Sequence, residues 1–342
     1  MQKVSVIIPL YNTEAFIGKT VQSVLDQTYP NFEVLIVNDQ SSDRSIEICQ
    51  QFQDERIQIL HQPNRGPSAA RNLGIRHATG DFVAFLDSDD LWRPDKLEKQ
   101  VAHLNQRPTV GISFTRSAFI DQTDKPLSYY QMPRLTDITL DHLFCRNPIS
   151  NGSAPMLRRE VLEAIQYSGT WQGEVETCYF DPDLLRSEDI ECWLRIGLQT
   201  QWQIEGIPEA LTLYRVSSGG SSLSSSVMKH LEDFEKMVAK TRLYAPDFIA
   251  QWEHLCRAYQ LRYLARRAIS RRDRTLALSL THRALKTHWQ ILWHEPRRTL
   301  ITIAAAYLLW LVPPALYRQI ELLGLQITGK LQHRRIRRDA IS

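Results

Sequence analysis

Two aspartates separated by a single residue follow the apolar run Phe82–Leu86, in the order Asp87-Ser88-Asp89-Asp90. Residues two apart in an extended segment point the same way, so Asp87 and Asp89 face one site. Such a pair of carboxylates suits a hard divalent cation, Mg²⁺ or Mn²⁺, whose other ligands come from phosphates and water. The competing interpretation is a turn whose aspartates cap the next helix, and this cluster alone does not decide between the two.

Polar residues also follow the three preceding apolar runs. They are Pro9-Leu10-Tyr11-Asn12, Asn38-Asp39 and Asn64–Asn72. The third opens a predicted helix and carries Arg65 and Arg71, which is typical of an anion site. Any one of these segments could be an ordinary turn. Four in succession favour a ligand site, because ligands bind beyond the carboxyl ends of the strands in open α/β sheets.

The elements that must position these residues alternate between strands and helices. Strands are predicted at Val4–Pro9, Phe32–Val37, Arg56–His61, Asp81–Leu86 and Val110–Thr115. Helices are predicted between the early strands, with Ser68 as the cap of one that runs to Ala78, and again at Ser187–Gly197. Strands that alternate with helices of about 10–15 residues predict an α/β fold with a helix-covered parallel sheet.

Taken in order, the motifs PLYN, VNDQSSD, NRGPSAARN, FLDSDD and SED…WLR resemble those of family 2 glycosyltransferases of the GT-A fold. The resemblance covers residues 3–225. It implies a nucleotide-diphospho-sugar transferase sandwich around a mixed, mostly parallel central sheet, here followed by a C-terminal α-helical extension. It also implies transfer of a sugar with inversion at the anomeric carbon. Gln40 departs from the family motif, which carries glycine there, so the turn must form without it.

The resemblance further implies which residues bind the donor. The nucleotide-binding set is Pro9, Tyr11, Asp39, Arg71 and Asp87. Within it, Pro9, Tyr11 and Asp39 would hold the base, most often uracil. Arg71 would approach the nucleotide. Asp87 would contact the ribose or the first metal shell. Asp89 would bind Mn²⁺ or Mg²⁺ under the diphosphate of a nucleotide-sugar donor, which the resemblance implies is a UDP-sugar.

The resemblance makes Asp189, in Ser187-Glu188-Asp189, the general base. Inverting transfer is a single displacement, which needs one carboxylate to take the acceptor proton and a cation to stabilise the departing diphosphate. Possible acceptor or diphosphate contacts are Glu188, Trp193 and Arg215. Without the resemblance, the two acids could simply complement a helix N-terminus, and an aromatic residue spaced like Trp193 is commonly part of a core.

The charge distribution suggests two tasks, chemistry in the first part of the chain and attachment in the second. Residues 1–225 hold 20 Lys and Arg against 29 Asp and Glu, whereas residues 226–342 hold 21 against 9. The predicted organisation is a catalytic domain at 1–225 (1–115 nucleotide-binding half, 116–225 acceptor half), a helical extension at 226–290, and an apolar helix with a basic tail at 291–342. An acidic body with a basic end predicts attachment to something anionic, unless the two are simply solvated surfaces.

Residues 299–317 carry no charge, which meets the lower length limit for a membrane span, but Pro313 and Pro314 interrupt them. Behind them, Lys330–Arg338 suits anionic lipid headgroups. A span, an interfacial helix and a helix packed on the core all remain open. We expect a cytoplasmic protein, peripheral at the inner face of the cell membrane, since the start of the chain has no signal-peptide pattern. Val216–Ser226 is expected to be a flexible loop.

Other classes fit less well. An oxidoreductase would carry GxGxxG after the first strand, where PLYN stands. The basic end lacks a nucleic-acid-binding motif, so no nucleic acid is expected as partner. The five cysteines have no zinc or disulfide spacing. The expected acceptor is a hydroxyl of a glycan or of a lipid-linked acceptor. The alternatives are transfer to a polyprenyl phosphate and a non-catalytic membrane-bound scaffold with a degenerate transferase domain.

Overall fold

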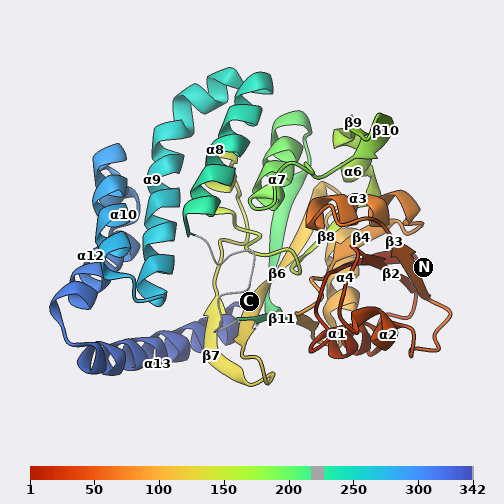
Figure 1. The fold of residues 1–342 in the computed structure, drawn as a ribbon, viewed down its shortest axis with the longest axis horizontal. Helices are drawn as coiled ribbons and strands as arrows, with labels where there is room; N and C mark the ends of the chain where they lie inside the picture. Colours follow the sequence, from red (N-terminus) through yellow and green to blue (C-terminus); the bar gives the residue numbers. More distant parts are fainter. Residues whose placement is uncertain (217–226, 341–342) are drawn as a thin grey trace. The chain divides into compact units, whose positions relative to one another are not determined.

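The computed structural model (Figure 1) describes residues 1–216 and 227–340. These residues form two compact units. The first unit contains residues 1–138, 148–216 and 329–340, and the second contains 139–147 and 227–328. The first is an α/β unit and the second is helical. Residues 139–147 belong to the helical unit, and residues 329–340 belong to the α/β unit.

The strands all lie in the α/β unit. They are β1 (Val4–Leu10), β2 (Phe32–Asn38), β3 (Ile57–His61), β4 (Phe82–Phe85), β5 (Leu91–Trp92), β6 (Val110–Ile120), β7 (Pro126–Gln131), β8 (Pro155–Arg158), β9 (Tyr167–Trp171), β10 (Glu174–Cys178) and β11 (Gln203–Arg215). Every strand predicted from the sequence is present. No strand after β6 is predicted from the sequence.

The helices of the α/β unit are α1 (Ile17–Leu25), α2 (Ser45–Cys49), α3 (Pro67–His77), α4 (Lys96–Gln106), α6 (Arg159–Ile165) and α7 (Glu188–Gln199). The helical unit contains α5 (Leu140–Arg146), α8 (Val227–Tyr244), α9 (Pro246–Ser270), α10 (Arg274–Thr287), α11 (Ile291–His294) and α12 (Pro296–Leu311). Helix α13 (Pro314–Asp339) begins in the helical unit and its last residues belong to the α/β unit.

The main sheet has the order β3-β2-β1-β4-β8-β6-β11-β5, with β7 paired to β6. The first four strands are parallel, so their carboxyl ends lie at one edge, as the motifs predicted. Strand β8 is antiparallel to both β4 and β6. The residues just before β8 therefore lie at the same edge as the residues just after β4. The mixed central sheet expected from the family resemblance is confirmed.

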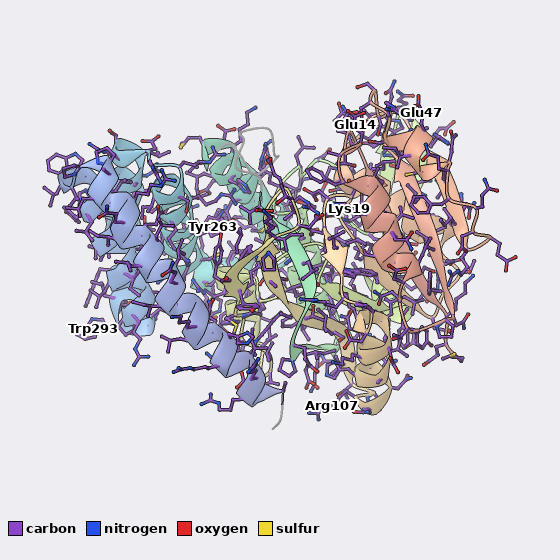
Figure 2. All side chains as sticks on the ribbon, turned by 90° about the horizontal axis from the view of Figure 1, so that it is seen from below. Glu14, Lys19, Glu47, Arg107, Tyr263 and Trp293 are labelled. Carbon is purple, nitrogen blue, oxygen red and sulfur yellow. The ribbon has the colours of Figure 1, made fainter. Side chains whose placement is uncertain are left out.

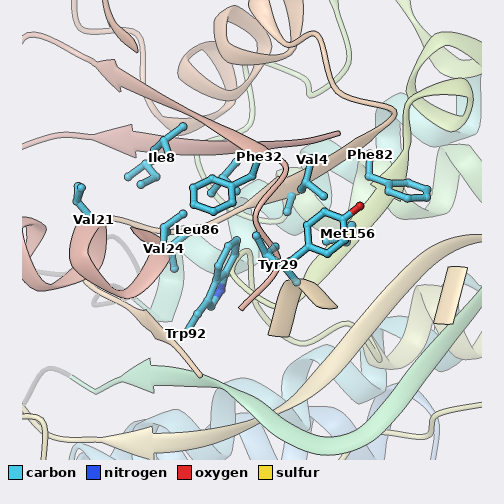
Figure 3. Packing of buried hydrophobic residues seen from close by; sticks show 14 of the residues in the cluster. Val4, Ile8, Val21, Val24, Tyr29, Phe32, Phe82, Leu86, Trp92 and Met156 are labelled. Atoms are coloured by element: carbon cyan, nitrogen blue, oxygen red, sulfur yellow. The ribbon is translucent and has the colours of Figure 1, made fainter. Parts of the chain in front are cut away.

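Helix α1 shows how the first half of the sheet is covered. Lys19 lies on its outer side (Figure 2), while Ile17, Val21 and Val24 are fully buried. Figure 3 shows Val21 and Val24 in one cluster with aromatic and aliphatic side chains from the strands. This amphipathic spacing is what holds the helix on the sheet. The loops that leave the carboxyl-terminal edge of this sheet carry the candidate site.

The turn after β2 forms without the glycine of the family motif. Gln40 adopts the left-handed conformation with φ of 61°, which costs a non-glycine residue about 1–2 kcal/mol. Its side-chain oxygen accepts a hydrogen bond from the backbone N–H of Asn64 at 3.1 Å. This contact offsets part of the cost. The departure at Gln40 therefore leaves the loop geometry intact.

The end of helix α13 packs on strand β7, within the α/β unit. The side-chain amide of Gln332 accepts from the backbone N–H of Tyr130 at 2.9 Å and donates to its C=O at 3.1 Å. Asp339 pairs with the buried Arg116 at 2.7 Å. A Cβ on Gly329 would lie 1.9 Å from the Ser128 carbonyl oxygen, so only glycine fits there. The tail is thus partly a structural element of the α/β unit, rather than a free basic segment.

The apolar segment 299–317 is divided between two helices. Helix α12 ends at Leu311, and α13 begins at Pro314, because a proline cannot continue the helix before it. Within residues 1–216 and 227–340, no helix combines the length and the apolar character that a membrane crossing requires. The predicted loop at Val216–Ser226 lies outside the described residues, apart from Val216.

Candidate active site

Asp39 lies at the carboxyl end of β2 and is only 3% exposed. One carboxylate oxygen accepts hydrogen bonds from the Gln62 side chain at 2.7 Å and from the Arg65 backbone N–H at 2.9 Å. The other accepts from the Gly66 backbone N–H at 2.8 Å. Asp39 therefore fixes the loop that precedes α3. Near it, Pro9 is half-buried at the end of β1 and Tyr11 is exposed.

Helix α3 begins at Pro67, one residue earlier than the predicted cap Ser68. Proline suits the first helical position, and Gly66 before it has φ of 84°. Arg65, expected at an anion site, stacks over the ring of Trp171 and pairs with Glu176 of the β9–β10 hairpin. Its charge is matched inside the protein. The hairpin thereby holds the loop that binds Asp39.

Arg71 connects two of the predicted motifs. Its side chain is 5% exposed and donates to Asp87 at 2.8 Å and to Glu188 at 2.8 Å. Burial lowers the pKa of its guanidinium, but the charges of Asp87 and Glu188 outweigh burial and raise it. Asp87 follows β4 and belongs to the donor motif, Asp87-Ser88-Asp89-Asp90. Glu188 begins α7, next to the predicted base Asp189. Arg71 therefore links the donor motif to the start of the helix that carries the predicted base. The structure thus brings Arg71, Asp87, Glu188 and Asp189 together.

The loop Asp87-Ser88-Asp89-Asp90, here called the DSDD loop, brings three aspartates close together. Burial and the charge of Asp87 raise the pKa of Asp89 to about 6. Asp90 is fully buried, and burial with the charges of Asp89 and Asp87 raises its pKa well above the ordinary value. Asp90 accepts from the Ser153 hydroxyl at 2.6 Å and from the Arg215 backbone N–H at 2.8 Å. Asp90 is therefore a structural residue, which its place in the motif did not reveal.

The described part of the chain has no group of three His, Cys, Asp or Glu side chains that could hold a metal by themselves. The chemistry at the DSDD loop nevertheless fits a divalent cation. Burial and, after it, the charge of Asp87 raise the pKa of Asp89, and a cation would offset both effects. Oxygen ligands suit Mg²⁺ and Mn²⁺. Such an ion would take its remaining ligands from phosphate and water.

Helix α7 begins with the two predicted acids. Asp189 is half-buried, and one of its oxygens accepts from the Ile190 backbone N–H at 2.8 Å. The Glu188 side chain is 12% exposed and is held by Arg71. Burial and the charge of Asp189 raise the pKa of Glu188 to about 7, outweighing Arg71, whose positive charge is shared with Asp87. Of the two acids, Glu188 is committed to the ion pair.

This raised pKa predicts a pH-dependent stability for the unliganded protein. Ionised Glu188 is disfavoured in the folded state, so its penalty is absent below pH of about 4.5 and complete above about 7. Replacing Glu188 with Gln removes the charge but keeps an acceptor for Arg71. We expect Glu188→Gln to raise the unfolding free energy at pH 8 by on the order of 1–3 kcal/mol. Thermal melts from pH 4.5 to 8 measure the difference from the wild type, which should shrink as the pH falls; a constant difference would contradict the assignment.

Two residues predicted as acceptor or diphosphate contacts, Trp193 and Arg215, are buried. Trp193 is 1% exposed and packs edge-to-face on Phe180 with ring centroids 5.7 Å apart, so it belongs to the core rather than to an acceptor pocket. Arg215 is 3% exposed. Its guanidinium donates to the backbone oxygens of Asp89 at 2.6 Å and Asp121 at 2.7 Å. It also pairs with Asp124 at 2.7 Å. It ties the end of β11 to the DSDD loop.

No sequence motif predicts the residues just before β8, which also contact the site. Gly152 and Ser153 precede that strand and contact Arg71, Asp87 and Asp90. Nothing in the segment Asn151–Ser153 resembles a motif. Their place at the site follows only from the pairing of β8 with β4.

The solved structures that are similar to this one define the class of fold. S. aureus TarS 1–349 in complex with UDP-GlcNAc matches with a TM-score of 0.55 at 20% identity, over 99% of this chain and 88% of that chain. The mannosyltransferase PcManGT from Pyrobaculum calidifontis, in complex with GDP-Man and Mn²⁺, matches with a TM-score of 0.56 at 21% identity, over 97% and 86%. The fold is that of the GT-A transferases.

The sequence comparisons establish the family. The family model described as glycosyl transferase family 2 matches residues 5–166. The putative teichuronic acid biosynthesis glycosyltransferase TuaG of Bacillus subtilis (strain 168) is 36% identical over 230 residues, which cover 66% of this chain and 83% of TuaG. An uncharacterized glycosyltransferase of Rickettsia felis is 34% identical over 220 residues, and the match spans only 33% of its length. The chain belongs to glycosyl transferase family 2 and is a glycosyltransferase.

Proposed function

We propose that the protein transfers a sugar, with inversion, from a nucleotide-diphosphate donor to a hydroxyl of a glycan or lipid-linked acceptor. The observation that carries the proposal is the bridge made by Arg71, which holds Asp87 of the donor motif and Glu188 beside Asp189 in one site. A UDP-sugar is the proposed donor. TarS, a fold neighbour, is solved in complex with UDP-GlcNAc, and TuaG is named for teichuronic acid biosynthesis.

In this mechanism Asp189 accepts the proton of the acceptor hydroxyl as its oxygen attacks the anomeric carbon. The bond from that carbon to the diphosphate oxygen breaks in the same displacement, so the configuration inverts. Glu188 and Arg71 hold the start of α7, and with it Asp189, against the donor motif. A Mn²⁺ or Mg²⁺ held by Asp89, with Asp87 beside it, would neutralise charge on the departing diphosphate.

Thermal shift with UDP, GDP and dTDP, each with and without Mn²⁺, tests the donor site. A ligand that binds only the folded state at a hundredfold excess over its Kd adds about 2.7 kcal/mol of stability. We expect a manganese-dependent rise in Tm with UDP. A rise in Tm with only GDP or dTDP would support the donor site but show that it binds a nucleobase other than uracil. No rise with any nucleotide would overturn the proposed donor and favour the degenerate scaffold.

We also propose that the C-terminal region attaches the protein to the cytoplasmic face of the membrane, which would suit a lipid-linked or polyprenyl-phosphate acceptor. Helix α13 exposes Leu316, Ile320, Leu323 and Ile327, whose spacing places them on one face of the helix. Trp293 of α11 is 74% exposed (Figure 2). Exposed apolar side chains beside basic ones are typical of helices that lie in a lipid interface.

Vesicle binding tests this attachment without disturbing the packed side of α13. Lys330, Arg334 and Arg337 are exposed, on the side away from Gln332 and Asp339. Replacing all three with Gln should weaken binding to phosphatidylserine vesicles by about 3 kcal/mol, at about 1 kcal/mol per basic residue.

A control variant carries the same loss of charge at Arg44, Arg107 and Lys125, which are exposed elsewhere. It should bind vesicles as the wild type does. Equal binding by both triple variants, or by the wild type to neutral and anionic vesicles alike, would contradict attachment through this basic face.

A further inference from the structure

The segment Asn151-Gly152-Ser153 lies against the DSDD loop although it belongs to none of the motifs. It precedes β8, which runs antiparallel to β4, with Ala84 opposite Met156 and Val83 opposite Leu157. The start of β8 therefore lies beside the end of β4, where the chain enters Asp87. All the contacts that follow lie within the α/β unit.

Gly152 leaves room for the ion pair between Arg71 and Asp87. A Cβ at this position would lie 2.9 Å from the Arg71 Nη2 atom and 3.0 and 3.1 Å from the two carboxylate oxygens of Asp87. These separations are shorter than van der Waals contact, so a side chain would displace the pair. The requirement for glycine here is one of space.

Ser153 fixes the DSDD loop through both of its hydrogen-bonding roles. Its hydroxyl accepts from the Asp87 backbone N–H at 3.0 Å and donates to the Asp90 carboxylate at 2.6 Å. Its carbonyl oxygen accepts from the indole N–H of Trp92 at 2.9 Å. Ser153 is fully buried, so these contacts are shielded from water. The hydroxyl thus holds the first and the last aspartate of the loop together.

Asn151 anchors the other end of the segment. Its side-chain amide donates to the Ser117 hydroxyl of β6 at 2.8 Å and to the Gln131 side chain of β7 at 2.6 Å. Its side-chain oxygen accepts from the Ser153 backbone N–H at 3.1 Å. Because both neighbours of Gly152 are held this way, the backbone at Gly152 cannot easily move away from the Arg71–Asp87 pair.

We propose that Asn151-Gly152-Ser153 is a positioning segment that determines the affinity for the nucleotide-diphosphate donor. It acts through Arg71 and Asp87, with Gly152 reserving the space that their ion pair occupies. The inference rests on the proposed function, since it concerns the donor of that same site. It adds residues to which neither the motifs nor the family resemblance gives a role.

The test measures the Kd of UDP, in the presence of Mn²⁺, by titration calorimetry on the full chain. Gly152→Ala should weaken UDP binding by about 10–100-fold, a loss of about 1.4–2.8 kcal/mol, because the added methyl group would displace the Arg71–Asp87 pair. Gly324→Ala is the matched control: the same methyl group at Gly324 meets nothing within 4 Å. The control should bind UDP as the wild type does.

Ser153→Ala provides a second variant that adds no atoms, in case Gly152→Ala does not fold. It removes the link between Asp87 and Asp90 and should also weaken UDP binding, by about 3–10-fold for a lost net contribution of about 1 kcal/mol. Circular dichroism melts separate the two roles. A merely structural role lowers Tm and leaves the Kd of the folded protein unchanged, which would overturn the inference. If the wild type binds none of the nucleotides, the proposed function itself is overturned.

Discussion

Asp189→Asn should nearly abolish sugar transfer while leaving nucleotide binding intact. The amide keeps the shape of the side chain and its contact with the Ile190 backbone N–H, but it cannot accept the acceptor proton. Loss of a general base lowers kcat by about 10²–10⁴-fold. Nucleotide release from the donor, followed at saturating donor and acceptor, measures kcat, and calorimetry with UDP measures Kd.

The control for this substitution is Glu163→Gln, which makes the same chemical change at an exposed position of α6. It should transfer at the wild-type rate. Because Glu188 is committed to Arg71, Glu188→Gln should affect donor affinity more than proton transfer. Full transfer by Asp189→Asn would refute the assignment of the base, and a loss of UDP binding equal to the loss of kcat would show that Asp189 acts on the donor instead.

Asp89→Asn should eliminate the manganese-dependent part of nucleotide binding and at the same time raise the Tm of the metal-free protein. Asp89 is crowded by Asp87, and burial with that charge raises its pKa to about 6. A folded-state pKa above the ordinary value means that the ionised form destabilises the fold above that pH. Removing the charge should therefore stabilise the metal-free protein at pH 8 by on the order of 1–3 kcal/mol.

A gain in stability together with a loss of binding excludes misfolding as the cause of the loss. Asp87→Asn provides the contrast, because the charge that it removes pairs with the buried Arg71, and a buried charge that loses a partner destabilises the fold. It should raise Tm less than Asp89→Asn does, since the weaker pairing of Arg71 offsets part of the gain. Melts of both variants with and without Mn²⁺ and UDP make the comparison. An Asp89→Asn protein that still shows the full manganese-dependent shift would refute Asp89 as the metal ligand.

The local sequence was sufficient to predict the first half of the sheet. Each of the strands β1 to β4 is a short apolar run followed by polar turn residues, and each predicted range overlaps the observed strand. The information lies within about ten residues, where periodicity and turn chemistry operate. The same local rules predicted α7 and the interruption of the apolar segment at Pro313 and Pro314.

Local patterns along the sequence do not predict which side chains pair with each other. Arg71 and Glu188 are 117 positions apart, and Arg116 and Asp339 are 223 apart. The sequence placed Arg65 at an anion site, whereas the β9–β10 hairpin supplies Glu176 as its partner. Trp193 and Arg215 were candidate contacts, and both are buried in structural roles. Each of these outcomes depends on which surfaces pack together.

The order and chemistry of the motifs, and with them the family, were determined by the sequence alone, because they depend on residue type and spacing along the chain. The tertiary structure decided that β8 is inserted antiparallel beside β4, which brings Gly152 and Ser153 to the DSDD loop. It also decided that the end of α13 pairs with the edge strand β7. A strand pattern shows which residues are buried but not which strand lies beside it, so these neighbours follow only from packing and long-range hydrogen bonds.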